Sequence, residues 1–139
     1  MQKLITAEIG KKATKFPLGS QDGKKGEALV LARFFTPANR FTWYMLEYDR
    51  KTGEAFGLCV GDYAEYGYFR PEELQNAKQE VSVLGYRATV QAVERDISVK
   101  PGKETLETLM KQNKEKCPDW RHEEEKTAPQ GTLDCLAAA

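Results

Sequence analysis

The side chains best suited to metal binding or nucleophilic catalysis are few and widely spaced. The chain has one histidine, His122, and three cysteines, Cys59, Cys117 and Cys135. Their spacing fits no zinc motif, since structural zinc takes four ligands and Cys59 falls in a predicted core strand. One histidine near the chain end does not favour a Cys–His or Ser–His–Asp site, whose nucleophile and base are held rigidly together. We expect no metal, cofactor or catalytic residue.

Carboxylates are the one catalytic side-chain type present in number. Glu47, Asp49, Asp62 and Glu65 lie on or beside neighbouring predicted strands. Acid–base catalysis needs two carboxylates that converge in a cleft with separated pKa values, and sequence spacing does not show convergence. We interpret them as solvated acids of hairpins. A carboxylate-dependent hydrolase that uses Glu47 or Glu65 is the third hypothesis, after the two binding functions below.

Aromatic residues gather between positions 41 and 69 and are the feature most above background. They are Phe41, Trp43, Tyr44, Tyr48, Tyr63, Tyr66, Tyr68 and Phe69. Strand alternation cannot bury all of them, so we expect one set in the core and another on a half-exposed face. Tyrosine, tryptophan and arginine are enriched at protein–protein hot spots. Stacking on bases is disfavoured because residues 41–77 are acidic, with 3 Lys and Arg against 7 Asp and Glu.

Charge is balanced overall but segregated along the chain. Lys and Arg number 21, as do Asp and Glu, so no net field draws the protein to nucleic acid or to an anionic membrane. Residues 1–40, however, hold 8 basic against 3 acidic side chains. Basic and acidic faces that neutralise each other after folding are the simpler interpretation, and electrostatic docking to a partner is the alternative.

The elements that position these residues are predicted to form a small antiparallel sheet. Segments rich in β-favouring residues and separated by turn residues predict a four-stranded meander over residues 28–35, 41–49, 55–60 and 65–69. The first segment is apolar on both faces except at Arg33, which is typical of a central strand. A fifth strand is expected near residues 88–99, and a helix over part of 81–97 is the alternative.

Helices are predicted on either side of this sheet. Thr6 caps a short helix, and Pro71 begins another that runs through Ala77. Residues 16–26, rich in glycine and lysine, predict a mobile surface loop. The apolar stripe of a last helix is formed by Leu106, Leu109 and Met110. The predicted fold is therefore α+β: an antiparallel four- to five-stranded meander with an N-terminal helix and helices packed on one face.

Length and hydropathy indicate one domain outside the membrane. The 139 residues fit a single α+β domain over residues 1–116, followed by a flexible tail over 117–139. Uninterrupted apolar runs are only a handful of residues long, whereas a membrane-spanning helix needs about 20. The N-terminus has no pattern of a secretory signal. We expect a cytoplasmic protein with reduced thiols.

Several short motifs occur in a characteristic order and spacing. They are Phe34-Phe35-Thr36-Pro37, Thr42-Trp43-Tyr44 with Glu47, Phe56-Gly57 with Val60-Gly61, Glu65-Tyr66-Gly67-Tyr68-Phe69 with Glu73-Leu74, and Glu94-Arg95-Asp96. Over about residues 3–110 the chain resembles the bacterial domain-of-unknown-function family DUF2958. The resemblance implies no reaction, only a setting among plasmids, conjugative elements and phages. Many small proteins of that setting block host defences by binding a nuclease complex or by mimicking DNA.

We therefore predict a non-enzymatic binding protein of a mobile element that inhibits or modulates a host protein or nucleoprotein complex, such as a defence nuclease. Anti-CRISPR and anti-restriction proteins act in this way. The expected contacts are the aromatic anchors Trp43, Tyr44 and Tyr68, the acids Glu47, Asp49 and Glu65, and the carboxylate-pairing Arg33 or Arg95. The alternative is a nucleic-acid-binding accessory protein that uses Lys11, Lys12, Lys15, Lys24, Lys25 and Arg40.

Overall fold

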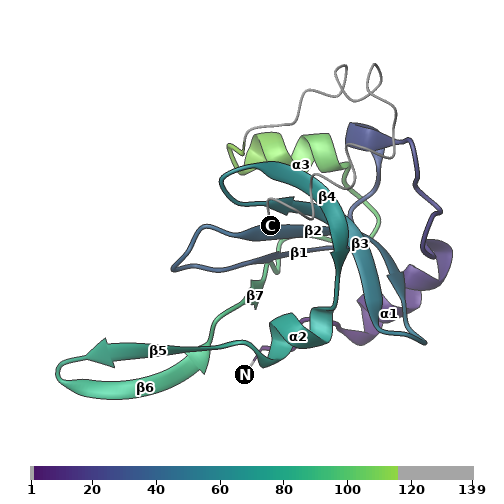
Figure 1. Cartoon of the computed structure of the whole chain (residues 1–139). Helices are drawn as coiled ribbons and strands as arrows, with labels where there is room; N and C mark the ends of the chain where they lie inside the picture. Colours follow the sequence, from purple (N-terminus) through teal and green to yellow (C-terminus); the bar gives the residue numbers. More distant parts are fainter. Residues whose placement is uncertain (1, 116–139) are drawn as a thin grey trace.

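The computed structural model describes residues 2–115 and shows an α+β fold (Figure 1). The strands are β1 (Ala32–Phe35), β2 (Thr42–Asp49), β3 (Glu54–Val60), β4 (Ala64–Phe69), β5 (Lys78–Val83), β6 (Tyr86–Gln91) and β7 (Glu94–Arg95). The helices are α1 (Ala7–Lys12), α2 (Pro71–Asn76) and α3 (Leu106–Gln112), with short 3-10 helices η1 (Ala13–Lys15) and η2 (Lys25–Glu27). The α+β prediction is confirmed, and the tail predicted over 117–139 lies outside the described residues.

The predicted meander is confirmed, because β1 to β4 pair antiparallel with their neighbours in chain order. The first strand is shorter than predicted, since residues 28–30 pair with residues 102–106 and not with β2. The Val30 N–H donates to the Glu104 carbonyl at 3.0 Å, and the Leu106 N–H donates to the Ala28 carbonyl at 2.8 Å. These hydrogen bonds tie the segment before α3 to the sheet.

The strand predicted over residues 88–99 is divided between two places. β7 joins the sheet beside β1, where Arg95 pairs with Phe34, and gives the sheet order β4-β3-β2-β1-β7. β6 pairs instead with β5 in a separate hairpin. No part of residues 81–97 is helical, so the helical alternative for this stretch is wrong.

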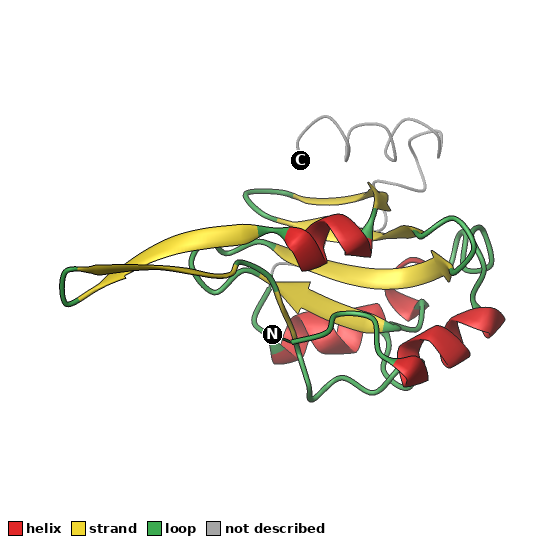
Figure 2. Ribbon diagram, turned by 90° about the horizontal axis from the view of Figure 1, so that it is seen from below, coloured by secondary structure: helices red, strands yellow, loops and turns green. Residues whose placement is uncertain are grey.

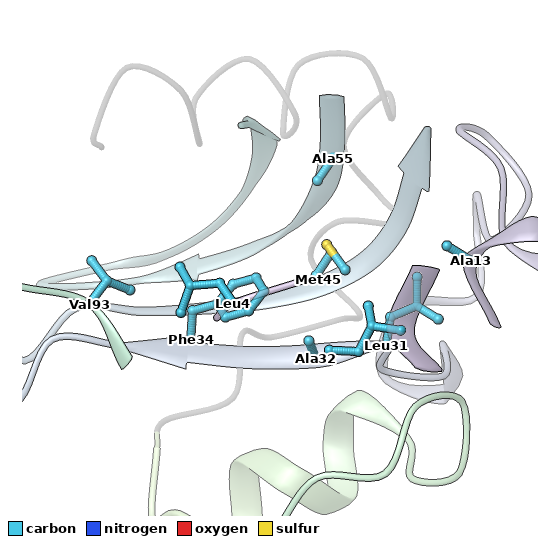
Figure 3. Packing of buried hydrophobic residues seen from close by; sticks show 9 residues of the cluster. Leu4, Ala13, Leu31, Ala32, Phe34, Met45, Ala55 and Val93 are labelled. Atoms are coloured by element: carbon cyan, nitrogen blue, oxygen red, sulfur yellow. The ribbon is translucent and has the colours of Figure 1, made fainter. Parts of the chain in front are cut away.

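Two clusters of buried side chains cover the two faces of the sheet. One contains Leu4, Ile9, Ala13, Leu31, Ala32, Phe34, Met45, Ala55 and Val93 (Figure 3). The other contains Ala28, Val30, Tyr44, Leu46, Leu58, Leu106, Leu109 and Met110. Because α1 supplies Ile9 to the first cluster and α3 supplies Leu106 to the second, helices lie on both faces and not on one as predicted. The meander is apolar on both sides of β2, so each face needs its own cover.

The predicted helix signals are present at the expected residues. The Thr6 hydroxyl accepts a hydrogen bond from the Ile9 N–H at 3.2 Å and so caps α1. Pro71 is the first residue of α2, where its missing N–H costs no helical hydrogen bond. The predicted apolar stripe of α3 is buried at Leu106, Leu109 and Met110.

An irregularity in β2 changes the direction of its later side chains. Met45 and Glu47 pair with consecutive residues of β3, so Leu46 is an extra residue in this strand. A β-bulge of this kind shifts the alternation by one position. Tyr48 therefore packs against the cluster of Met45, whereas regular alternation predicts that it shares the face of Tyr44.

The loop over residues 16–26, predicted to be a mobile surface loop, lies on the surface and is attached to the sheet through Gln21 and Glu47. Gln21 is 4% exposed. Its side-chain amide donates to the carbonyls of Leu46 at 2.7 Å and Leu29 at 2.8 Å, and its Oε1 accepts from the Leu29 N–H at 2.7 Å. The buried Gln21 side chain thus fixes the loop through three hydrogen bonds to the backbone of Leu29 and Leu46.

The hairpin of β5 and β6 extends away from the sheet and its helices. Figure 1 shows it leaving the fold beyond α2, and the view from below in Figure 2 shows the same projection. Most of its residues are exposed. We refer to residues 78–91 as the arm.

Candidate protein-binding surface

Tyr44 is fully buried, so the prediction that it anchors a surface contact is wrong. Its side chain is 0% exposed and packs in the cluster that α3 covers. Its hydroxyl accepts a long hydrogen bond of 3.4 Å from Arg33 Nε. Burial and the nearby Glu115 carboxylate raise the pKa of Tyr44, so the phenol stays protonated at neutral pH. A protonated phenol of this kind is no general base.

Arg33 forms ion pairs with carboxylates of its own chain. Its Nη1 lies 3.1 Å from Asp96, and its Nη2 lies 3.0 Å from Glu115. Its guanidinium also lies 5.1 Å from the centre of the Phe35 ring. Burial alone would raise the pKa of Asp96, but hydrogen bonds from Ser98 and the Arg33 charge outweigh burial and lower it. These contacts join β1 to the segments after β7 and α3, so we assign Arg33 a structural role.

Glu47 is a buried anchor, and it is neither a solvated acid nor a surface contact as predicted. Its side chain is 2% exposed. Its two carboxylate oxygens accept the backbone N–H groups of Gly19 at 2.6 Å and Gln21 at 2.8 Å. Burial raises the pKa of Glu47, and the two hydrogen bonds oppose that rise. Glu47 and Gln21 together fix the loop over residues 16–26.

Tyr68, the third predicted aromatic anchor, has an exposed side chain. Tyr68 on β4 is 51% exposed. It pairs across the strands with Phe56, and their ring centres lie 4.9 Å apart at 62°. The other side of Phe56 stacks on Tyr66 at 6.0 Å and 4°. We call Tyr66, Phe56 and Tyr68 the aromatic row; its packing holds the Tyr68 ring in place.

Trp43 does not belong to the same surface as Tyr68. It is half-buried against the cluster of Phe34 and Met45, on the face that α1 covers. Its ring centre lies 6.2 Å from that of Phe41, which is 40% exposed. A partner on the aromatic row would therefore contact Tyr68 and not Trp43.

The remaining predicted contacts are distributed over the sheet. Asp49, half-exposed at the end of β2, accepts the Lys51 N–H at 2.9 Å and lies two register positions beyond Tyr68. Glu65 is half-buried on β4 opposite Cys59. Arg95 lies on β7 at the other edge of the sheet, where its Nε donates to the Lys3 carbonyl at 3.2 Å. Strand alternation places Asp49 on the same face as Tyr68 and Glu65 on the opposite face, so Asp49 is the half-exposed predicted acid that shares the surface of Tyr68.

The predicted basic residues do not form one patch. Lys11, Lys12 and Lys15 belong to α1 and η1, which pack on the first cluster. Lys24 and Lys25 lie at η2, beside α3 on the other face, and Arg40 is in the turn between β1 and β2. A nucleic-acid groove needs its cations along one path. This separation disfavours the nucleic-acid alternative.

The candidates for metal binding and nucleophilic catalysis are divided between the described residues and the rest of the chain. Residues 2–115 contain no group of three His, Cys, Asp or Glu side chains placed to hold a metal ion. Burial, with a contribution from Glu65, raises the pKa of Cys59, so its reactive thiolate form is suppressed. The other metal-ligand candidates, Cys117, His122 and Cys135, lie outside the described residues. No helix within 2–115 has the length and apolar character that crossing a membrane requires.

The arm carries exposed apolar residues that we did not predict. Val83, Leu84 and Tyr86 are 61%, 94% and 79% exposed, and Val90 is 40% exposed. A sequence signal for them exists, since apolar residues alternate on both sides of Leu84 and Gly85, and the glycine suits a tight turn. We missed this signal because we assigned residues 88–99 to one long strand.

Comparison with known proteins identifies the family. Residues 4–116 match the family described as protein of unknown function DUF2958. The match spans most of the chain, and the chain therefore belongs to this family. No curated protein and no solved structure shows a significant match. The resemblance inferred from the sequence motifs is thus confirmed at the level of the family.

Proposed function

We propose that this protein is a non-enzymatic protein-binding module of a mobile genetic element, and that it inhibits or modulates a host defence complex. The observation that carries the proposal is Tyr68. A large aromatic side chain that is half exposed and already ordered by Phe56 loses little conformational freedom when a partner covers it. Such residues supply much of the binding energy at protein interfaces.

The surroundings of Tyr68 favour a partner with a basic surface. Asp49 and Glu54 lie at the same end of the sheet, and Glu72 and Glu73 are exposed in the first turn of α2 that follows, so acids outnumber the basic residues of this end, Arg50, Lys51 and Arg70, by four to three. Acidic groups around an aromatic anchor speed association with a positively charged partner and exclude acidic ones. A defence nuclease, which must hold nucleic acid, presents surfaces of this charge.

A protein-binding function is also preferred because the alternatives have weaker support. Of the two carboxylates that the hydrolase hypothesis uses, Glu47 is occupied by two backbone N–H groups, and Glu65 is half-buried on β4 opposite Cys59. The cations that nucleic acid would need are divided among α1, η2 and the turn between β1 and β2. Neither set converges on one cleft, whereas the aromatic row is already assembled.

The test is binding by variants once a partner has been captured from a host lysate. Tyr68→Ala should weaken binding at least about tenfold, which corresponds to about 1.4 kcal/mol. The matched control is Tyr63→Ala, which removes an exposed tyrosine from the turn between β3 and β4. Equal affinity of wild type and Tyr68→Ala would contradict the proposed contact.

A further inference from the structure

The arm has two faces of different chemistry. Cross-strand pairing places Gln79 opposite Val90, Val81 opposite Ala88 and Val83 opposite Tyr86. Since side chains of paired residues point to the same face, these six form one uncharged, mainly apolar face. The opposite face carries Lys78, Glu80, Ser82, Arg87, Thr89 and Gln91. Every charged residue of the arm therefore lies on one face.

The tip of the arm adds one more exposed apolar side chain, Leu84. Leu84 and Gly85 both have positive φ, at 51° and 84°, and connect paired residues of β5 and β6. This is the geometry of a type I′ turn, whose preferred first residue is Asn, Asp or Gly. A leucine there is strained and 94% exposed, so it contributes no burial to the fold.

The base of the arm is fixed, so the arm has a defined direction. The Ala92 N–H donates to the Ala77 carbonyl at 3.0 Å. The Gln91 amide exchanges two hydrogen bonds with the backbone of Gln2, at 3.0 and 2.9 Å. Val93, the next residue but one, is buried in the first cluster. Beyond this base the arm extends clear of the sheet and helices (Figure 2), so another molecule can reach both of its faces.

The charges of the arm decide which occupant fits. With Lys78, Arg87 and Glu80 the arm carries a net charge of only +1, and all three lie away from the apolar face. A β-ribbon that binds DNA or anionic lipid needs several cations toward its ligand. An identical apolar face is a suitable occupant, because stacking two of them brings no like charges together.

We infer that the arm docks face to face on the arm of a second copy of this chain, in a two-fold symmetric dimer. This inference is independent of the proposed function, since it uses neither Tyr68 nor a host partner. At roughly 100 Å² per Val or Leu and 200 Å² per Tyr, the exposed fractions of the four large side chains give about 350 Å² per arm. Two arms bury about 700 Å², the size of a weak, reversible interface.

The test is the oligomeric state of the full chain over a wide concentration range. Sedimentation should show a monomer at about 10 µM and dimer appearing toward about 1 mM, as a contact of this size predicts. On dilution, NMR amide shifts should change at residues 79–90 and stay constant at Tyr68. A monomer at every concentration would overturn the inference.

Variants separate the two faces of the arm. Leu84→Asn with Tyr86→Thr should abolish the dimer, because it removes apolar surface while Asn-Gly still suits the turn and Thr still suits a strand. Arg87→Thr, on the polar face, should leave the dimer intact. A dimer that survives the double variant, or is lost with Arg87→Thr, would overturn the inference.

Two further readouts distinguish dimerisation from misfolding and from ligand binding. Leu84→Asn alone should weaken dimerisation and leave the thermal unfolding midpoint unchanged or higher, which separates loss of the dimer from loss of the fold. Binding of the wild-type monomer to duplex DNA or to phospholipid vesicles, without dimer formation, would overturn the inference in favour of that ligand.

Discussion

Glu47 shows how a side chain with the composition of a surface residue determines the fold. It lies in an acidic segment, yet it is buried and accepts two N–H groups from the loop over residues 16–26. Loop amides that point into a protein need an acceptor, and a carboxylate supplies two oxygens. The sequence pattern shows the acid but not this partner, because the two are separated by 26 residues or more.

Replacing Glu47 should destabilise the protein without changing its surface. Glu47→Gln keeps the shape but turns an N–H donor toward one of the loop amides, so we expect a loss of about 1–3 kcal/mol in the free energy of unfolding. Urea denaturation followed by tryptophan fluorescence measures this loss. Asp49→Asn, two residues away and half-exposed, is the control and should change stability by less than about 0.5 kcal/mol.

Asp96 should make stability depend on pH in the acidic range. The pKa of Asp96 is lower in the folded chain than its ordinary value of 3.8, so the folded state releases this proton more readily than the unfolded chain. The stabilisation is complete above pH 3.8 and is lost as the pH falls through the lower folded pKa. Asp96→Asn should lower stability at pH 7 by about 1–2 kcal/mol.

The pH dependence of stability distinguishes loss of the Asp96 charge from a general loss of packing. Denaturant midpoints of wild type and Asp96→Asn should converge as the pH drops below 3.8, because protonation removes the same charge. The raised pKa of Glu47 makes stability depend on pH in the opposite direction. Glu47 is present in both proteins, so its contribution cancels when their stabilities are compared. A difference between the two proteins that stays constant down to about pH 2 would contradict the lowered pKa of Asp96.

At the scale of the element, the β-bulge in β2 is the feature that sequence alternation missed. The alternation of side chains along a strand correctly places Tyr44 and Met45 on opposite faces of the sheet. After Leu46 the phase shifts by one residue, and the faces of Glu47 and Tyr48 are exchanged. An extra residue in a strand leaves no mark on residue composition, so the pattern before the bulge is predictable and the pattern after it is not.

Gly57 lies opposite the start of this bulge and should tolerate no side chain. A Cβ at this position would lie 1.8 Å from the Tyr44 carbonyl oxygen, which belongs to the backbone and cannot move aside. Gly57→Ala should therefore cost at least about 3 kcal/mol of stability. The control is Gly23→Ala, which has positive φ but open space around it and should cost about 1 kcal/mol. Similar losses in both variants would mean that β2 and β3 are less closely packed.

At the scale of the whole molecule, the meander and the three helices were predictable because each has local signals. Each helix signal lies within a few consecutive residues: the N-cap Thr6, the first helical residue Pro71 and the apolar stripe that begins at Leu106. The division of helices between both faces depends on long-range packing, and so does the place of β7 beside β1. The arm was missed because neither of its strands contributes to a core.

The candidate surface was predictable only in part. Tyr68 is exposed and Asp49 is half-exposed at the same end of the sheet, whereas Tyr44 and Glu47 are buried. Residue type identified aromatic and acidic candidates, but exposure depends on which strands and helices cover them. The aromatic row follows from the pairing of β3 with β4, and this pairing selects Tyr68 among the candidates.

The central claim is that this protein binds a protein partner, and capture from host lysate tests it most directly. The tagged chain and its Tyr68→Ala variant would be compared at about 0.1 M and about 0.5 M salt, with bound protein and nucleic acid both quantified. We predict a stoichiometric protein complex that persists at the higher salt with wild type and is strongly reduced with Tyr68→Ala. Nucleic acid alone, released as salt rises and unaffected by the variant, would contradict the claim.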